Sequence, residues 1–213
     1  MLNEKLQDYI DSLIQPRQGL LAEMEEYAEI NGVPIMEPAG IETMLQLLRI
    51  QQPDMILEVG TAIGYSALRM AFSLPKTKIV TLERDEERYN LALKYIKRSG
   101  LQGQIVQIKG DALELEQEVS DYAPFDAIFI DAAKGQYRRF FEIYSKSLKP
   151  GGMIITDNVL FKGHVFDDQE IESKRIRSLV KKIDEFNRWL ASHPEYDTII
   201  LPIGDGVAVS KKR

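Results

Sequence analysis

Three oxygen-bearing side chains and one lysine follow apolar runs of this sequence. Asp131 comes directly after one such run, Asp157 and Asn158 come directly after another, and Lys134 lies three residues beyond Asp131. Two carboxylates and an amide, with no Cys or His beside them, form a set of hard oxygen donors of the kind that Mg²⁺ prefers. We therefore expect Asp131, Asp157 and Asn158 to bind a divalent cation. The alternative is that both aspartates are only solvated strand ends.

A strand–helix–strand unit must position these side chains. Apolar runs predict strands at Asp126–Ile130 and Met153–Thr156, and helical spacing predicts a helix between them at Gln136–Ser147. A Pro-Gly-Gly turn is expected before the second strand. Parallel strands joined in this way end at the same edge of the sheet, which is where ligands bind in open α/β folds.

A neighbouring cation favours loss of a proton from a hydroxyl group, which is otherwise a poor nucleophile. Lys134 is the candidate to accept that proton, provided that burial and nearby positive charge lower its pKa. The alternative for Lys134 is a solvated lysine at the start of a helix.

The alternation of β and α segments continues through most of the chain. Further strands are expected at Met55–Val59, Lys78–Leu82 and Ile105–Lys109, and further helices at Tyr65–Ser73, Glu86–Ser99 and Ala112–Val119. A long helix at Gln169–Ser192 precedes a terminal pair of strands at Thr198–Leu201 and Val207–Ser210. This order predicts an α/β fold with a mostly parallel, doubly wound seven-stranded sheet and a C-terminal antiparallel strand pair.

Three further helices are expected before the first strand. Their predicted ranges are Asn3–Ile14, Pro16–Asn31 and Ala39–Ile50. We expect residues 1–52 to form a helical cap within a single domain that spans residues 1–213, because no linker or repeat interrupts the pattern.

The composition is that of an ordinary globular protein and excludes some chemistry. Of the 213 residues, 44% are hydrophobic and 28% are charged, the net charge is −6, and there is no Cys. Disulfides, zinc–thiolate sites and a cysteine nucleophile are therefore excluded. We expect a cytoplasmic protein without a membrane partner, because the sequence has no apolar signal core and no run of membrane-spanning length. The acidic balance argues against a general nucleic-acid coat, although it allows a local basic patch.

A glycine turn and two acidic strand ends suggest a nucleotide-like ligand. Gly60 and Gly64 lie between a predicted strand and a predicted helix, in a spacing that fits neither the dinucleotide fingerprint nor a Walker loop. Glu83 ends the next strand, where a carboxylate can accept hydrogen bonds from ribose hydroxyls. Asp111 follows the third strand. Together these residues indicate an adenosine-containing ligand without a pyrophosphate, although the glycine turn alone is equally a tight strand–helix connection.

Six motifs in order resemble the cation-dependent O-methyltransferases, the family of the catechol and caffeoyl-CoA enzymes. They are EVGTAIGYS at 58–66, the acidic Glu83, GDA at 110–112, IDAAKGQY at 130–137, DNVLFKGHV at 157–165 and PIGDG at 202–206. The resemblance covers about residues 30 to 213. It implies a Rossmann-like methyltransferase fold, S-adenosylmethionine (SAM) as methyl donor, Mg²⁺ as cofactor and a homodimer.

The resemblance also assigns roles by position. It implies SAM contacts at Met36, Glu58, Ser66, Glu83, Asp111, Ala112 and Asp131. The glycine turn adds Gly60 to this set of cofactor-binding candidates. It implies metal ligands at Asp131, Asp157 and Asn158, and it places Lys134 where the family has a proposed general base. Phe161 and Lys162 stand where plant-type enzymes often carry Trp-His, which disfavours a phenylpropanoid acceptor.

The sequence most resembles bacterial members of the family that methylate 5-hydroxyuridine at the wobble position of tRNA. That resemblance implies a tRNA anticodon loop as partner, with Arg138, Arg139, Lys162 and the basic run Lys174–Lys182 as candidate phosphate contacts. The alternative acceptor is a small catechol-like molecule.

Two other classes of function remain open from the sequence. One is a nicotinamide-dependent oxidoreductase, which the missing third glycine disfavours. The other is a catalytically silent RNA- or nucleotide-binding module. The candidate metal ligands disfavour it, because binding alone needs no metal.

Overall fold

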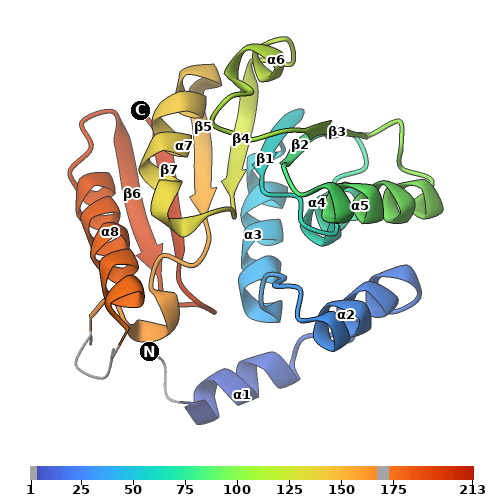
Figure 1. Ribbon diagram of the computed structural model, residues 1–213, viewed down its shortest axis with the longest axis horizontal. Helices are drawn as coiled ribbons and strands as arrows, with labels where there is room; N and C mark the ends of the chain where they lie inside the picture. The colour runs from blue at the N-terminus through green and yellow to red at the C-terminus, as the bar shows by residue number, and fades with distance from the viewer. Residues whose placement is uncertain (1–3, 167–172) are drawn as a thin grey trace.

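The computed structural model describes residues 4–166 and 173–213, and its central element is one seven-stranded sheet (Figure 1). The strands are β1 (Met55–Val59), β2 (Lys78–Glu83), β3 (Ile105–Lys109), β4 (Phe125–Ile130), β5 (Leu148–Thr156), β6 (Tyr196–Leu201) and β7 (Val207–Lys212). Their order is β3-β2-β1-β4-β5-β7-β6, and β7 runs antiparallel to both of its neighbours. The predicted fold class, including the C-terminal antiparallel pair, is confirmed.

Helices lie on both faces of this sheet. The α-helices are α1 (Glu4–Ser12), α2 (Leu20–Asn31), α3 (Pro38–Gln51), α4 (Tyr65–Ser73), α5 (Glu86–Ser99), α6 (Glu116–Ser120), α7 (Tyr137–Tyr144) and α8 (Lys174–Ala191). Short 3₁₀ helices are η1 (Lys134–Gln136), η2 (Ser145–Ser147) and η3 (Phe161–Gly163). In Figure 1, α1 and α2 lie below the edge toward which β4 and β5 point. No helix among the described residues is long and apolar enough to cross a membrane.

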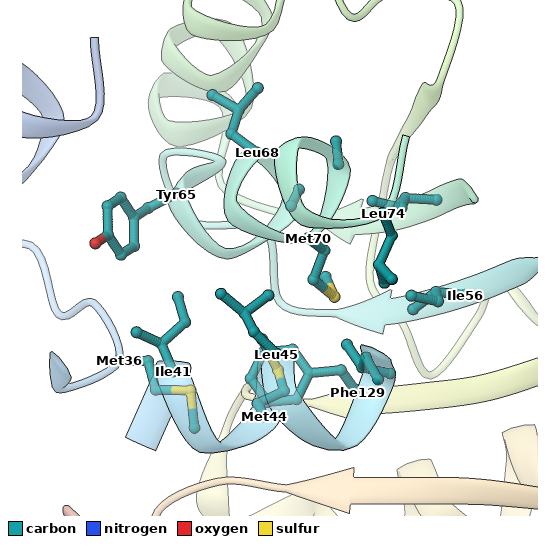
Figure 2. Packing of buried hydrophobic residues seen from close by; sticks show 14 of the residues in the cluster. Met36, Ile41, Met44, Leu45, Ile56, Tyr65, Leu68, Met70, Leu74 and Phe129 are labelled. Carbon is teal, nitrogen blue, oxygen red and sulfur yellow. The ribbon is translucent and has the colours of Figure 1, made fainter. Parts of the chain in front are cut away.

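Two hydrophobic clusters, one on each face, hold the sheet between its helices. On one face, Ile56 and Phe129 pack with side chains of α3 and α4, including Leu45 and Met70 (Figure 2). The other cluster joins alternate residues of the same strands to α7 and α8, for example through Phe186. Because the central strands are buried on both faces, their sequences are continuous apolar runs. Polar side chains can then gather only where those runs end.

Two predicted helix starts are wrong, for local reasons. The second helix begins at Leu20 and not at Pro16, and Gly19, with φ 58°, holds its N-cap position. The helix predicted at Ala112–Val119 begins only at Glu116. The Asp111 carboxylate accepts a hydrogen bond from the Leu113 amide at 2.9 Å, which makes a turn that competes with a helix at this point.

Three other segments differ in detail from their predicted ranges. The helix predicted at Gln136–Ser147 is α7 flanked by η1 and η2. The Pro-Gly-Gly segment lies inside β5, where a register shift against β4 accommodates it. For α8, residues 169–172 of the predicted range lie outside the described residues, as does residue 3 of the first predicted helix. From Ser173 onward, the Ser173 hydroxyl caps α8 by accepting the Ile176 amide at 3.5 Å.

Candidate active site

A cavity of about 710 Å³ opens where β1, β2, β3 and β4 end. Residues that end or directly follow these strands line it, and so do residues from other segments, among them Pro34, Phe140, Asn158 and Leu179. The predicted site residues in its wall are Gly60, Glu83, Asp111, Ala112, Asp131, Lys134 and Asn158. The structure thus brings the glycine turn, the acidic strand ends and part of the candidate metal set to one place.

Gly60 allows β1 and β4 to approach each other at their ends. Its φ is 107°, and a Cβ atom at this position would stand 2.1 Å from the Asp131 carbonyl oxygen. The Asp131 amide in turn donates to the Val59 carbonyl at 3.0 Å. A side chain at Gly60 would therefore displace Asp131, which carries one of the candidate metal ligands.

Glu83 is held in one orientation at the end of β2. One carboxylate oxygen accepts the Ala62 amide and the other accepts the Asp85 amide, each at 2.8 Å. The side chain is buried but lines the cavity. Because a carboxylate has about four lone-pair sites, Glu83 keeps acceptor capacity for hydroxyl groups of a ligand.

Three predicted cofactor residues are absent from the cavity wall. Met36 belongs to the hydrophobic cluster that Figure 2 shows, beside Ile41. Glu58 is fully buried, and its carboxyl group accepts hydrogen bonds from the hydroxyls of Ser66 and Thr81. The Glu58 network therefore ties β1 to β2 and to the start of α4. Direct contact of Met36, Glu58 or Ser66 with a cofactor stays a prediction.

Burial dominates the electrostatics of Glu58. Loss of hydration raises its pKa to about 8, against the two hydroxyl hydrogen bonds, which lower it. At neutral pH this carboxyl group is therefore mostly protonated and acts as a structural link.

The candidate metal ligands meet at the ends of β4 and β5. The Asp157 amide donates to the Ile130 carbonyl at 3.1 Å, which sets the two strand ends side by side. The Asn158 side-chain amide donates to Asp157 Oδ2 at 2.6 Å, and Asn158 has a left-handed backbone with φ 62°. Burial and the neighbouring Asp131 raise the pKa of Asp157 to about 8, and burial also raises the pKa of Asp131.

Lys134 lies within this group of oxygen donors. Its ammonium group donates a hydrogen bond to Asn158 Oδ1 and lies 5.8 Å from the centre of the Phe161 ring. Burial lowers the pKa of Lys134, while the negative charges of Asp131 and Asp157 oppose that shift. The direction of the shift is the one that a general base requires.

The segment at residues 202–206, which was not expected beside the candidate metal ligands, fixes the loop after Asn158. The carbonyls of Asp205 and Gly206 accept the amides of Leu160 and Val159 at 2.8 and 3.0 Å. Gly206 has φ 88°, and a Cβ atom there would meet Leu160 Cγ at 2.4 Å. The negative charge of Asp205 also acts on Asp157 and on Lys134. The PIGDG motif was the only signal of this contact, and nothing in its residues placed it beside the candidate metal ligands.

Other cavity residues were also missed. They are Pro34, Ile35, Arg84, Arg88, Leu113, Gln136, Phe140 and Leu179. The ring of His164 packs with its centre 5.7 Å from that of Phe161, and His164 is not in the cavity wall.

No group of three Asp, Glu, His or Cys residues able to hold a metal occurs among residues 4–166 and 173–213. The candidate set has only two such residues, and its third donor is the amide of Asn158. Such a set leaves positions for water and substrate oxygens, as Mg²⁺ sites commonly do.

The sequence model of a family described as O-methyltransferase matches residues 15–213. The chain belongs to this O-methyltransferase family.

Individual O-methyltransferases match over nearly the whole chain. A catechol O-methyltransferase from Niastella koreensis is 36% identical, covering 97% of this chain and 96% of its own length. A caffeoyl-CoA O-methyltransferase from Populus kitakamiensis is 33% identical, covering 90% of this chain and 83% of its own. This chain is a SAM-dependent O-methyltransferase of the catechol and caffeoyl-CoA type.

Solved O-methyltransferase structures share the fold. A Staphylococcus aureus protein, provisionally described as a caffeoyl-CoA O-methyltransferase, has a TM-score of 0.92 at 39% identity, covering 97% of this chain and 99% of its own. A Bacillus cereus O-methyltransferase in complex with SAH has a TM-score of 0.82 at 29% identity, covering 98% of this chain and 97% of its own.

Substituting Gly60 in this O-methyltransferase is expected to damage both fold and site. Gly60→Ala would force the ends of β1 and β4 apart, and we expect it to lower the free energy of unfolding by about 1–3 kcal/mol, the cost of a strained backbone position. SAM binding should weaken in parallel. Urea unfolding and calorimetry measure the two effects.

Gly103→Ala is the matched control, because Gly103 has no positive φ and a Cβ atom there meets nothing within 4 Å. Its stability should stay within about 0.5 kcal/mol of the wild type. Equal effects of the two substitutions would contradict the role given to Gly60.

The buried Glu58 should give the O-methyltransferase a pH-dependent stability. Its pKa rises from 4.5 in its unperturbed state to about 8 in the folded protein. The folded state therefore holds more protons than the unfolded chain between these values, so its stability falls as pH rises through that window, by up to about 1.4 kcal/mol per pH unit. Glu58→Gln removes this titration and should flatten the fall in stability.

Urea unfolding at pH 5, 6, 7 and 8 tests this expectation, with Glu87→Gln as an exposed control on α5. Wild type and Glu58→Gln should diverge steadily across the series. Parallel curves for the two proteins would show that Glu58 ionises normally in the folded state.

Proposed function

We propose that this O-methyltransferase transfers a methyl group from SAM to a hydroxyl oxygen in a reaction that requires Mg²⁺, and that the acceptor is 5-hydroxyuridine at the wobble position of tRNA. The observation that carries the chemistry is the meeting of two sets of residues in one cavity. Glu83 and the glycine turn form one set, Asp131, Asn158 and Lys134 form the other, and all of them line the cavity.

The residues present fit the cofactor. Glu83, oriented by two backbone amides, offers free acceptor sites to the hydroxyls of a ribose. Asp111 and Ala112 line the cavity at the end of β3, where an adenine edge would lie. We infer that these residues hold the adenosine part of SAM, with Gly60 leaving room at the turn.

The residues present also fit a divalent cation. The donors are all hard oxygens, and a positive charge, the ammonium group of Lys134, already stands against one of them. Asp131, Asp157 and Asn158 would hold the cation, which would lower the pKa of an acceptor hydroxyl.

The side chains of this protein would then position the acceptor and handle its proton. Burial lowers the pKa of Lys134, so its amine is suited to accept the proton of the hydroxyl. Phe161 lies beside Lys134, with its ring centre 5.8 Å from the ammonium group. No covalent nucleophile is needed, because positioning of two reactants can supply up to about 7–11 kcal/mol of the barrier.

The tRNA acceptor is consistent with this chemistry. The 5-hydroxyl and 4-carbonyl of 5-hydroxyuridine lie on adjacent carbons, as the two oxygens of a catechol do. An anticodon loop presents unstacked bases that can enter a pocket. We also propose that the enzyme works in the cytoplasm as a homodimer, as expected for a tRNA-modifying member of this family.

Basic residues near the cavity support an anionic partner. The basic half of α8 lies beside η1, where a Cβ atom at Gly135 would be 3.9 Å from Lys182. A second cavity of about 650 Å³ is lined by residues that include Lys174, Arg177 and Lys181. Arg138 contributes less, because its guanidinium pairs with Glu142 at 2.9 Å. Phosphate contacts by such residues would make binding sensitive to salt.

The acceptor is tested by comparing two substrates. Purified protein, SAM and Mg²⁺ are incubated with tRNA that carries 5-hydroxyuridine, from a strain lacking the modifying enzyme, and separately with a free catechol. We expect nucleoside mass spectrometry to detect 5-methoxyuridine, in a reaction that weakens as salt rises. Unmodified tRNA together with efficient methylation of the catechol would replace the RNA proposal with a small-molecule one.

A further inference from the structure

Lys134 makes a contact that its proposed role as a base does not explain. Its ammonium group donates to Asn158 Oδ1, and the other end of the same amide donates to Asp157 Oδ2 at 2.6 Å. The negative charges of Asp131 and Asp157 both act on it. A positive charge of the protein's own therefore stands among the three oxygen donors that would hold a divalent cation.

We propose that Lys134 is an internal counter-ion of this donor set, which a divalent cation must displace in order to bind. This inference rests on the proposed cation site. The physical reason is that an ammonium group and a divalent cation compete for the same amide oxygen. They also repel each other strongly at the distance that sharing it would impose.

The geometry gives the displaced side chain a place to go. Lys134 lines the large cavity, and its ammonium group lies near the Phe161 ring, on the side of the site formed by η3. The negative charge of Asp205 also attracts the ammonium group. Because Lys134 and Asn158 both line this cavity, the displaced side chain has the cavity beside it.

Displacement couples two events of the reaction. While the ammonium group is bound to Asn158, it is not available to an acceptor hydroxyl. Cation binding takes over the amide oxygen and releases Lys134 toward the cavity. Lys134 thus has two effects: it keeps the donors together when no cation is bound, and it weakens cation binding by competing for the site.

The test is the affinity of cation-free protein for Mg²⁺, measured by titration calorimetry without SAM or acceptor. Lys134→Met removes the charge and keeps most of the length of the side chain, and Lys134→Gln keeps a hydrogen-bond donor without the charge. We expect both variants to bind Mg²⁺ at least about tenfold more tightly than the wild type. Lys134→Arg, which keeps the charge, should show no such gain, and Lys94→Met is an exposed lysine control on α5.

Thermal unfolding in EDTA and in Mg²⁺ gives a second readout. In EDTA, Lys134→Met should melt below the wild type, because its carboxylates have lost their counter-ion. Mg²⁺ should raise its melting temperature by more than it raises that of the wild type. Lys134→Gln decides the affinity question if the methionine variant does not fold.

Two results would overturn the inference, and they differ in meaning. If the wild type binds Mg²⁺ and both uncharged variants bind it equally or more weakly, Lys134 is no competitor. If the wild type binds no Mg²⁺ at millimolar concentration, the cation site itself is wrong and the counter-ion role falls with it.

Discussion

Asp157→Ala is expected to lower methyl transfer by at least about 100-fold while leaving SAM affinity within a few-fold of the wild type. Removing a residue that only hydrogen-bonds to a metal ligand typically lowers metal affinity or activity about 10–100-fold. Asp157 would be a ligand itself, so its loss should cost more. Asp157 is buried beside Asn158 but is not part of the cavity wall where SAM would lie. Initial rates and SAM calorimetry separate the two effects.

The Asp157→Ala variant should fold and be about as stable as the wild type. Burial and the nearby Asp131 raise the pKa of Asp157, so this carboxylate is poorly accommodated in the folded state without a cation. Thermal unfolding should therefore stay close to that of the wild type. The exposed Asp121→Ala serves as the control for loss of an aspartate. Near-normal turnover by Asp157→Ala would remove Asp157 from the proposed metal set.

Glu83→Ala is expected to weaken SAM binding by about 1.5–3 kcal/mol, the range for hydrogen bonds to a charged group. This corresponds to a dissociation constant raised about 10- to 150-fold. The alanine variant also leaves the amides of Ala62 and Asp85 without their acceptor, so part of the loss will come from the turn itself.

Glu83→Gln separates these two contributions. The glutamine keeps one acceptor oxygen and the shape of the side chain, but loses the charge. We expect its SAM affinity to lie between those of the wild type and of Glu83→Ala, whereas the exposed Glu87→Ala should bind normally. Calorimetry that finds unchanged affinity in Glu83→Ala would reduce Glu83 to a structural strand-end charge.

The strand ends were predictable because the central strands are buried on both faces. Apolar runs marked the ends of β4 and β5, and the first polar residue after each run had to lie at the sheet edge. Right-handed crossovers then placed Asp131 and Asp157 on the same edge, and the structure bears this out.

The same burial explains why the sequence could not tell which predicted site residues line the cavity. In a strand without alternating polarity, sequence does not tell whether a polar residue faces the cavity or the interior. Glu58 faces inward and binds Ser66 and Thr81, so these residues lie behind the cavity wall. Met36 was placed by resemblance to the family alone, and in this structure it packs in the hydrophobic core.

Contacts between distant segments could not be predicted at all. The hydrogen bonds from the Val159 and Leu160 amides to the carbonyls of Gly206 and Asp205 depend on how two loops meet in space. The contact of Lys134 with Asn158 depends on a side-chain rotamer, which no spacing in the sequence specifies. Local turn chemistry also prevailed over helical periodicity after Asp111.

The need for a divalent cation is tested most directly by the rate of methyl transfer from labelled SAM in protein stripped with EDTA. The stripped enzyme should be inactive toward either acceptor. Added Mg²⁺ should restore activity with a concentration dependence that matches the binding curve from calorimetry. Full activity in EDTA would contradict the proposal that Asp131, Asp157 and Asn158 hold a catalytic cation.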